Sequence, residues 1–278
     1  MRVRIVSTLL GLLCLALVLS ILLVLLPGRP WHDESGTTVE GVSAIHLFYP
    51  MNHPQQNVFS YLQPYVKITA QLSMVSLGFV VLLATFFVVL RAPGQPKILQ
   101  LALEQLMILL LSLPSLFVAP LLIFLFSYQL KLFDSALLAK PSDFVLPALA
   151  LALRPAALLA QMFIRRSQVE ARQDYVRTAK AKGLSRMKIW FTHIGRNSII
   201  PLVSYLPAIV TTFLSGSFLI EYLFALPGLG TVFVSALGER DYSVVFWLTL
   251  GFAAISIMSS EFFRWVTYCI DPRQRDEL

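Results

Sequence analysis

The chain has 278 residues, of which 57% are hydrophobic and 13% are charged, and its mean hydropathy is +0.74. This composition excludes an ordinary soluble globular domain and predicts an all-α integral membrane protein, because each spanning helix needs roughly 20 apolar residues. The net charge of +7 does not indicate nucleic-acid binding, since the basic residues gather at the ends of apolar segments and suit cytoplasmic loops.

The first apolar segment covers residues 5–26 and follows two arginines. It is longer than the apolar region of a signal peptide and lacks a small-residue cleavage site, so it predicts a transmembrane helix with a cytoplasmic N-terminus. Residues 27–66 are polar and contain prolines, and we expect a periplasmic loop. Scattered loop histidines are usually solvated, so no metal site is predicted; a nickel site made of His32, His46 and His53 is the alternative.

Residues 68–90 predict the second helix, and residues 91–97 predict a tight cytoplasmic turn with positive ends. The long apolar stretch over residues 98–128 predicts the third helix. Pro114 and Pro120 remove backbone hydrogen bonds from it, so we expect a kink or a break. A bend that lines the pore and a bend that only serves packing are equally compatible with this pattern.

Residues 144–164 predict the fourth helix, and Arg154 lies roughly ten residues into it, near the middle of the membrane. An unpaired charge at that depth costs several kcal/mol, so Arg154 is expected to face a partner or a wet cavity. Glu104 and Glu221 are the candidate partners. A role in the pathway or between helices and a role as an incidental snorkelling residue are both open.

A fifth helix is predicted over residues 199–219, and a sixth over residues 243–268. Between them, Pro227 and Gly228 break regular structure and predict an outer re-entrant turn, which survives at membrane depth only when it is buried in protein. Six spans place both termini and the basic loops in the cytoplasm. We therefore predict a single transmembrane domain over residues 1–278.

The longest polar run between two apolar segments covers residues 165–198 and carries nine arginines and lysines against two acidic residues. Such a positive loop is expected in the cytoplasm. Its pattern predicts two short helices, the first ending at Gly183 and the second capped by Ser185. Ala179 and Ala181 lie beside the bend, where small side chains allow another protein to approach the backbone. A solvated basic loop that only sets topology is the alternative.

The phrases DYVRTAKAKGLS and HIGRNSIIP in this loop resemble the cytoplasmic loop of bacterial ABC-importer permeases for dipeptides, oligopeptides and nickel, which carries a variant of the EAA motif. Eleven positions match in fixed order: Asp174, Tyr175, Val176, Arg177, Ala179, Ala181, Lys182, Gly183, Arg196, Asn197 and Pro201. The PGLG phrase at residues 227–230 and the DPR phrase at residues 271–273 also resemble that family. In the family, the loop forms a coupling helix that docks into a cleft on the ATPase subunit.

The resemblance implies the six-helix fold of ABC-importer permeases and a subunit that forms half of the translocation pathway for peptides or a related small solute. The implied surroundings are the bacterial inner membrane, a second homologous permease, two ABC ATPase subunits and an extracytoplasmic substrate-binding protein. ATP and Mg²⁺ would be bound by the ATPase subunits, so no cofactor and no enzymatic activity are expected in this chain.

The resemblance also suggests roles for individual residues. We predict that the ATPase-coupling loop acts through Asp174, Tyr175, Arg177, Ala179, Ala181, Lys182, Gly183 and Leu184. The candidates for the pathway or its gate are Pro114, Arg154, Glu221, Pro227 and Gly228.

Two other functions stay open. The glycine-rich GDxGxS phrase that the family carries in its periplasmic region is missing, which favours an accessory or diverged permease-like subunit as one alternative. A stand-alone channel is the other, although the chain shows no inverted repeat. An intramembrane enzyme is disfavoured, because HExxH, GxSxG and GxxxxGK[ST] motifs are absent. The substrate, the partner permease and the choice between homodimer and heterodimer are not determined by the sequence.

Overall fold

The computed structural model describes residues 2–25, 48–50, 53, 55–133 and 140–270. Within these residues the protein is helical and contains no strand. The α-helices are α1 (Arg2–Leu25), α2 (Val58–Leu90), α3 (Lys97–Ser112), α4 (Ser115–Leu122), α5 (Val145–Glu170), α6 (Asp174–Ala181), α7 (Arg186–Lys188), α8 (Gly195–Ile199), α9 (Leu206–Leu223), α10 (Leu229–Glu239) and α11 (Tyr242–Ile270). Short π- and 3₁₀-helical turns connect some of them: Ile123–Gln129, Pro141–Phe144, Ile189–Ile194 and Ile200–Tyr205.

Four of the described helical stretches are long and apolar enough to cross a membrane: α2, α5, Arg186–Leu223 and α11. The pair Lys97–Ser112 and Leu116–Gln129, bent by 113°, makes a fifth if it is counted as one broken span. Helix α1 is 24 residues long, and its described apolar part is Leu10–Ile21. The prediction of a helical membrane protein is confirmed, whereas the count of six spans is not.

The fifth predicted span differs most from expectation. We predicted a loop up to residue 198, but one helical stretch runs from Arg186 to Leu223. Ser185 caps its N-terminus, because the Ser185 hydroxyl accepts a hydrogen bond from the Lys188 amide. The predicted cap is therefore confirmed. A π-turn and a 3₁₀-turn then carry the chain past Pro201 without a break. The predicted cytoplasmic loop is therefore continuous, from Arg186 onward, with an apolar helical stretch long enough to span a membrane.

Helix α5 lies at the centre of the bundle. In its apolar window 61% of the residues are buried, against 22% in α2 and α11. It packs against α2, α3, α4, α8 and α9. Small side chains permit this close packing, because they let helix backbones approach each other. The buried alanines of α5 are Ala148, Ala150, Ala152, Ala156, Ala157 and Ala160.

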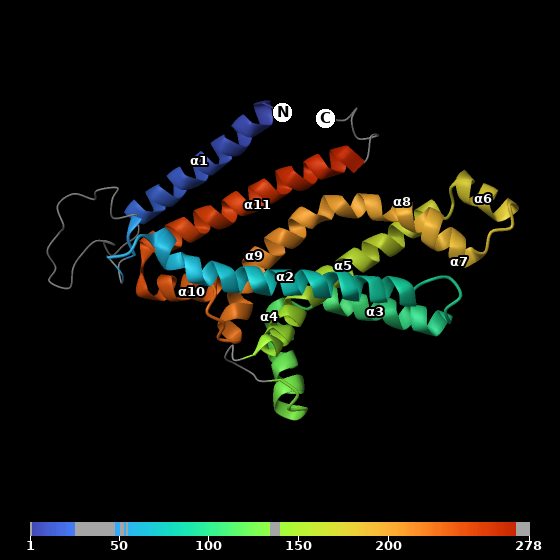
Figure 1. Cartoon of the computed structure of the whole chain (residues 1–278), viewed down its shortest axis with the longest axis horizontal. Coiled ribbons are helices and arrows are strands. Elements are labelled where there is room, and N and C mark those ends of the chain that lie inside the picture. The colour runs from blue at the N-terminus through green and yellow to red at the C-terminus, as the bar shows by residue number, and fades with distance from the viewer. Residues whose placement is uncertain (1, 26–47, 51–52, 54, 134–139, 271–278) are drawn as a thin grey trace.

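Helices α9, α10 and α11 form a second layer beside this core, with α10 packed against both α9 and α11. Aromatic rings join them: Phe218 lies 5.0 Å from Phe233 and 4.5 Å from Phe252 between ring centroids. Helix α1 packs along α11. Helix α6 and the turn between α2 and α3 lie at one end of the molecule, and the start of α1 and the end of α11 are the ends of those helices that point toward that side (Figure 1).

Candidate coupling surface and translocation face

Helix α6 is the tip of the predicted cytoplasmic loop. Asp174 lies in its first turn and Lys180 in its last turn, and both charges suit the helix dipole. The helix ends at Gly183, whose φ of +75° lies in the left-handed region that favours glycine. The Gly183 amide donates to the Lys180 carbonyl over 3.0 Å. The predicted helix stop is thus confirmed, and its reason is the backbone conformation.

The inner side of α6 is buried against its own chain. Val176 is 1% exposed and Ala179 is 6% exposed. Both belong to an apolar cluster with Ala92, Phe163, Ile189, Trp190 and Ile194. We predicted that Ala179 contacts the ATPase, but its side chain supports α6 from within, because so short a helix must bury an apolar face to stay attached. Moving α6 alone would expose this cluster to water.

A polar clamp adds to this attachment at the end of α5. The Tyr175 hydroxyl donates to Glu170 Oε2 over 2.7 Å, and Arg166 Nη2 lies 2.8 Å from Glu170 Oε1. The Glu170 side chain is 8% exposed. Burial raises the pKa of Tyr175 above its ordinary value, and the neighbouring Glu170 carboxylate acts in the same direction, so the hydroxyl keeps the proton that it donates. Sequence reasoning missed the role of Glu170, although its i, i+4 spacing from Arg166 indicated it.

The outer side of the loop is open to solvent. Of the predicted coupling residues, Asp174, Tyr175, Arg177, Ala181, Lys182 and Gly183 are exposed and Leu184 is half-buried. Asp174 and Arg177 form an exposed ion pair of 3.3 Å. Met187 and Phe191 add exposed apolar side chains on the next helical segment, at 46% and 48%. A partner therefore meets a charged helix with apolar residues beside it.

The glycine-rich turn after α9 is closed. Glu221 is completely buried, and its Oε2 accepts the Gly230 amide over 2.6 Å. The hydroxyl of Thr69 on α2 accepts the Leu229 amide over 2.8 Å. Thus Glu221 and Thr69 bind the first amides of α10, which a helix leaves unpaired. Sequence reasoning missed Thr69, because nothing in α2 marks its contact with a residue 160 positions away.

The two glycines of this turn are needed for space. A Cβ atom at Gly228 would overlap the carboxyl group of Glu221, and one at Gly230 would overlap the backbone of Phe218. Pro227 lies exposed beside them. Glu221 thus serves the packing of the turn and does not line an open path here. The gating roles of Glu221, Pro227 and Gly228 stay predictions.

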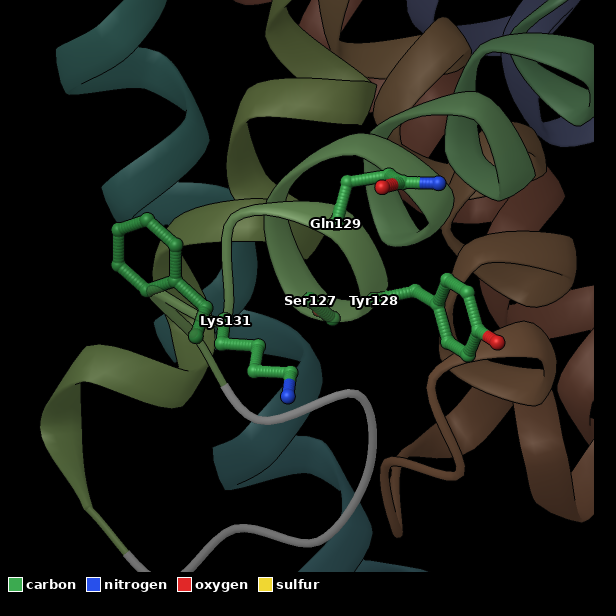
Figure 2. A pocket seen from close by; sticks show the side chains of 5 residues that line it. Ser127, Tyr128, Gln129 and Lys131 are labelled. Carbon is green, nitrogen blue, oxygen red and sulfur yellow. The ribbon is translucent and has the colours of Figure 1, made fainter.

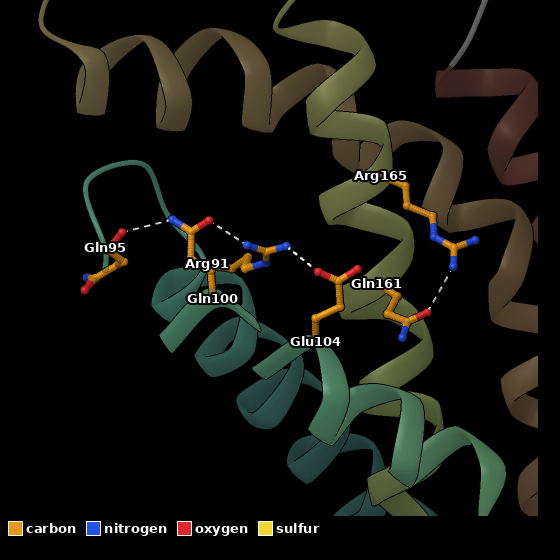
Figure 3. A network of polar contacts seen from close by, with 6 residues as sticks. All are labelled: Arg91, Gln95, Gln100, Glu104, Gln161 and Arg165. Atoms are coloured by element: carbon orange, nitrogen blue, oxygen red, sulfur yellow. Dashed lines mark hydrogen bonds and ion pairs between the residues drawn. The ribbon is translucent and has the colours of Figure 1, made fainter. Parts of the chain in front are cut away.

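A second polar network lies where α2 turns into α3 (Figure 3). Arg91 Nη2 lies 2.8 Å from Glu104 Oε2, and Arg91 Nη1 donates to Gln100 Oε1 over 2.6 Å. Gln100 in turn donates to the Gln95 carbonyl over 3.1 Å. This network ties the two helices together at the end nearest the coupling loop. Glu104 is therefore engaged by Arg91.

Arg154 has neither of its predicted partners. Glu104 pairs with Arg91, and Glu221 binds the turn before α10, so the predicted pairing is wrong. The Arg154 side chain is exposed on α5, and it makes no ion pair with any residue that the structure describes. Arg154 lies within the spanning helix α5, as predicted, but its side chain points out of this chain's core.

The proline break in the third apolar stretch is confirmed. Pro114 is extended, with φ of −61° and ψ of 141°, and it separates α3 from α4. Beyond it, the π-helix Ile123–Gln129 ends at an open pocket of about 580 Å³ lined by Ser127, Tyr128, Gln129, Lys131 and Phe133 (Figure 2). None of the predicted site residues lines this pocket. Whether Pro114 lines a pathway stays a prediction.

The predicted histidine trio is described only in part. His32 and His46 lie outside the described residues, and the ring of His53 lies 5.0 Å from that of Tyr61. No group of three histidine, cysteine or acidic residues that could hold a metal ion occurs in the described part of the chain.

Comparison with protein families identifies the chain. The family model described as "Binding-protein-dependent transport system inner membrane component" matches residues 89–276. The chain belongs to this family. It is accordingly a membrane permease of the ABC-importer class. The matched range includes the coupling loop, α5 and the glycine-rich turn described above.

Two relatives of this permease match over nearly their full length. The "Dipeptide transport system permease protein DppB" of Bacillus subtilis (strain 168) is 32% identical over 91% of this chain and 90% of that protein. The "Oligopeptide transport system permease protein OppB" of Haemophilus influenzae is 28% identical over 91% of this chain and 92% of its own. A solved structure titled "Crystal structure of an amino acid ABC transporter with histidines" matches with a TM-score of 0.57 at 16% identity, over 76% of this chain and 94% of the solved one. That likeness supports the fold.

Proposed function

We propose that this permease is one of two permease subunits in an ABC importer that takes up short peptides. The relatives named for dipeptide and oligopeptide transport, which match over about nine-tenths of the chain, support peptides as the cargo. An extracytoplasmic binding protein delivers the peptide, and two ATPase subunits bind ATP and Mg²⁺. This chain contributes half of the pathway and does not hydrolyse ATP.

We further propose that α6 and both termini face the cytoplasm. The excess of basic residues in the loop that contains α6 supports this orientation. The start of α1 and the end of α11 are the ends of those helices that point toward the side where α6 lies, which is consistent with it (Figure 1).

The single observation that carries the coupling mechanism is the double attachment of α6. Its inner face is buried with Phe163 of α5 and with Trp190 of the Arg186–Leu223 stretch. The clamp at Glu170 adds a hydrogen bond and an ion pair between α5 and α6. A displacement of α6 is therefore passed to two long helices at once.

The exposed side of α6 is then the docking side for the ATPase. ATP binding closes the ATPase dimer and moves α6, and the two attached helices rock with it between inward-open and outward-open states. This is a shift between two conformations, in which ATP favours one. The residues proposed for the contact are Asp174, Tyr175, Arg177, Ala181, Lys182, Gly183 and Leu184.

Two matched glycine variants test this mechanism. Gly183 and Gly94 both have positive φ, +75° and +106°, and a Cβ atom at either would meet nothing within 4 Å. Gly183→Asp and Gly94→Asp therefore both place an aspartate at a positive φ without a clash, at a backbone cost of at least about 1–2 kcal/mol. We expect only Gly183→Asp to lose the ATPase subunits when the tagged chain is purified from its native membrane in mild detergent. Equal recovery of the ATPase with both variants would contradict the docking role.

A transport assay separates the working permease from an accessory subunit. Complexes with and without this chain are reconstituted into liposomes, and ATP-dependent uptake of a radiolabelled dipeptide is measured. We expect uptake only when the chain is present. Uptake that persists without it would establish the accessory function.

A further inference from the structure

One face of α5 carries polar side chains from Arg154 to Gln168, although α5 is the most enclosed of the spanning helices. The exposed or half-buried positions include Arg154, Leu158, Gln161, Arg165 and Gln168. Their spacings of four, three, four and three residues place them on a single helical face. The opposite side carries four buried alanines at spacings of four residues: Ala148, Ala152, Ala156 and Ala160. The face is thus distinct from the surfaces that bury α5 in its own chain.

This face does not suit lipid. An arginine near the middle of a spanning helix lies toward protein or a water-filled cavity, because its transfer into hydrocarbon is costly. The large exposed side chains in the inner half of α2 are apolar, by contrast, and they include Met74, Leu82 and Phe86. The chain therefore separates an apolar surface that suits lipid from a cationic face that needs water.

The neighbouring helix extends this face. A Cβ atom at Gly216 of α9 would lie 3.0 Å from the Leu151 side chain of α5, and one at Gly195 of α8, toward the other end of the same helical stretch, would lie 3.8 Å from the Phe163 ring of α5. The order of these contacts means that the two helices run antiparallel. Counting about 100° per residue from the contacts, the exposed face of α5 and the exposed face of α9 with Thr212 turn to the same side.

The hydroxyl groups on α9 are oriented to accept hydrogen bonds. Thr212 Oγ1 donates to the Ala208 carbonyl over 2.8 Å, and Ser215 Oγ donates to the Thr211 carbonyl over 2.9 Å. Both side chains are exposed. With its proton used in this way, each oxygen presents only lone pairs to a ligand. The combined face therefore offers cationic donors on α5 and neutral acceptors on α9.

The charge on the α5 face is not compensated by an acidic residue of that face. Arg165 Nη2 makes a 3.5 Å contact with Gln161 Oε1 (Figure 3). The adjacent Arg166 is different, because it is paired with the buried Glu170. Arg154 and Arg165 are eleven positions apart, which is about 16 Å along the helix axis. They are two cationic positions arranged along the direction of transport.

We propose that Arg154 and Arg165 are successive binding positions for a carboxylate group of the transported solute. This inference rests on the proposed function, and it specifies the chemistry that the pathway recognises. A guanidinium group binds a carboxylate through two parallel hydrogen bonds. The hydroxyl oxygens on α9 accept hydrogen bonds from the amide or amino groups of the same solute. Two exposed positions bind the anion without trapping it, which transport requires.

The test compares the uptake of two dipeptides by the reconstituted complex. Both have uncharged side chains: one is dialanine with a free C-terminal carboxylate, and the other is dialanine amide. We expect the wild-type complex to take up the acid faster than the amide. Arg154→Gln reduces uptake of the acid about tenfold, the effect of losing one charge-assisted hydrogen-bonded pair, and leaves uptake of the amide unchanged. Arg154→Lys restores part of the preference for the acid. Arg264→Gln, which breaks an exposed pair with Glu261 on α11, serves as the control and changes neither rate.

Three outcomes of this assay would overturn the proposal. Equal uptake of the acid and the amide by the wild-type complex would show that no carboxylate is recognised. An equal loss of both probes in Arg154→Gln would make Arg154 an interface residue that pairs with the second permease. If both Arg154→Gln and Arg165→Gln still took up the acid faster than the amide, neither arginine would bind the carboxylate. If the Arg154 variant does not assemble, Arg165→Gln carries the comparison, because it lies near the end of α5.

A labelling experiment tests the face without depending on peptide transport. Arg154→Cys and Leu82→Cys are each made in a Cys14→Ser, Cys269→Ser background within the whole complex. We expect a water-soluble anionic methanethiosulfonate to modify Arg154→Cys and to leave Leu82→Cys unmodified. Inert cysteines at both positions would place Arg154 in lipid and overturn the inference. Failure of peptide uptake together with modification of Arg154→Cys would overturn only the peptide cargo.

Discussion

The helical stretch Arg186–Leu223 has a glycine turn at each end, one at Gly183 before its start and one at Gly228 and Gly230 after its end, and the two turns use glycine for different reasons. At Gly183 the backbone is left-handed, and the space where a side chain would lie is empty. At Gly228 and Gly230 that space is filled by Glu221 and by the backbone of Phe218. The comparison shows that the first turn is open to solvent, whereas the second is part of the protein interior.

The largest expected effect is at the closed turn. Gly230→Val places branched carbons against the Phe218 backbone, which cannot move without shifting α9. We expect a loss of about 3 kcal/mol, at the upper end for overpacked sites, seen as a lower thermal midpoint of the purified chain in detergent.

Gly183→Ala is the matched variant at the open turn. We expect it to lose about 1–2 kcal/mol of stability, because only the backbone conformation is strained. A similar thermal midpoint for Gly183→Ala and Gly230→Val would contradict the distinction between the two turns.

The next effect concerns the acceptors that hold the closed turn. Glu221→Ala leaves the buried Gly230 amide without its acceptor, and we expect a loss of about 1–3 kcal/mol. Glu221→Gln keeps an acceptor oxygen and should lose less. Thr69→Val should resemble Glu221→Ala, and Thr69→Ser should resemble the wild type, when unfolding is followed by tryptophan fluorescence.

A smaller effect is expected at the clamp behind the open turn. Tyr175→Phe removes one hydrogen bond to Glu170, worth about 1 kcal/mol, and we expect slower peptide uptake with normal insertion into the membrane. Because the folded pKa of Tyr175 is raised from its ordinary value of 10.0, its stabilising contribution is complete below that value and is lost as the pH rises through the folded pKa.

A pH series of thermal midpoints checks this sign. The difference between the wild type and Tyr175→Phe should be constant at neutral pH and should shrink only in alkaline solution. A difference that shrinks on acidification through the neutral range would assign the effect to another group.

The smallest effect is expected at the exposed surface of α6. The Asp174 and Arg177 side chains are 94% and 78% exposed, and such pairs contribute little to stability. Arg177→Ala should therefore leave the thermal midpoint unchanged while it weakens recovery of the ATPase subunits. A clear loss of stability would show that the pair supports α6 itself.

Residues whose role depends on local conformation were predictable. The stop at Gly183, the cap at Ser185 and the break at Pro114 all follow from rules that involve a few neighbouring residues. The contacts of Arg154, Glu104 and Glu221 were not predictable in this way. Glu104 pairs with Arg91, and Glu221 accepts the Gly230 amide. Hydropathy cannot predict these tertiary contacts, and so the predicted ion pairs with Arg154 were wrong.

The sequence by itself determined that this protein is helical and belongs in a membrane, because composition and apolar run length decide both. It also determined the family, through the sequence motif of the predicted coupling loop and the family match over residues 89–276. Only the tertiary structure decided which side of each helix is used. The burial of Ala179, the clamp at Glu170 and the outward turn of Arg154 depend on how α5 packs against its neighbours. Packing selects one face among several that a helical period allows, and so a period alone cannot assign a residue to the core, the lipid or the pathway.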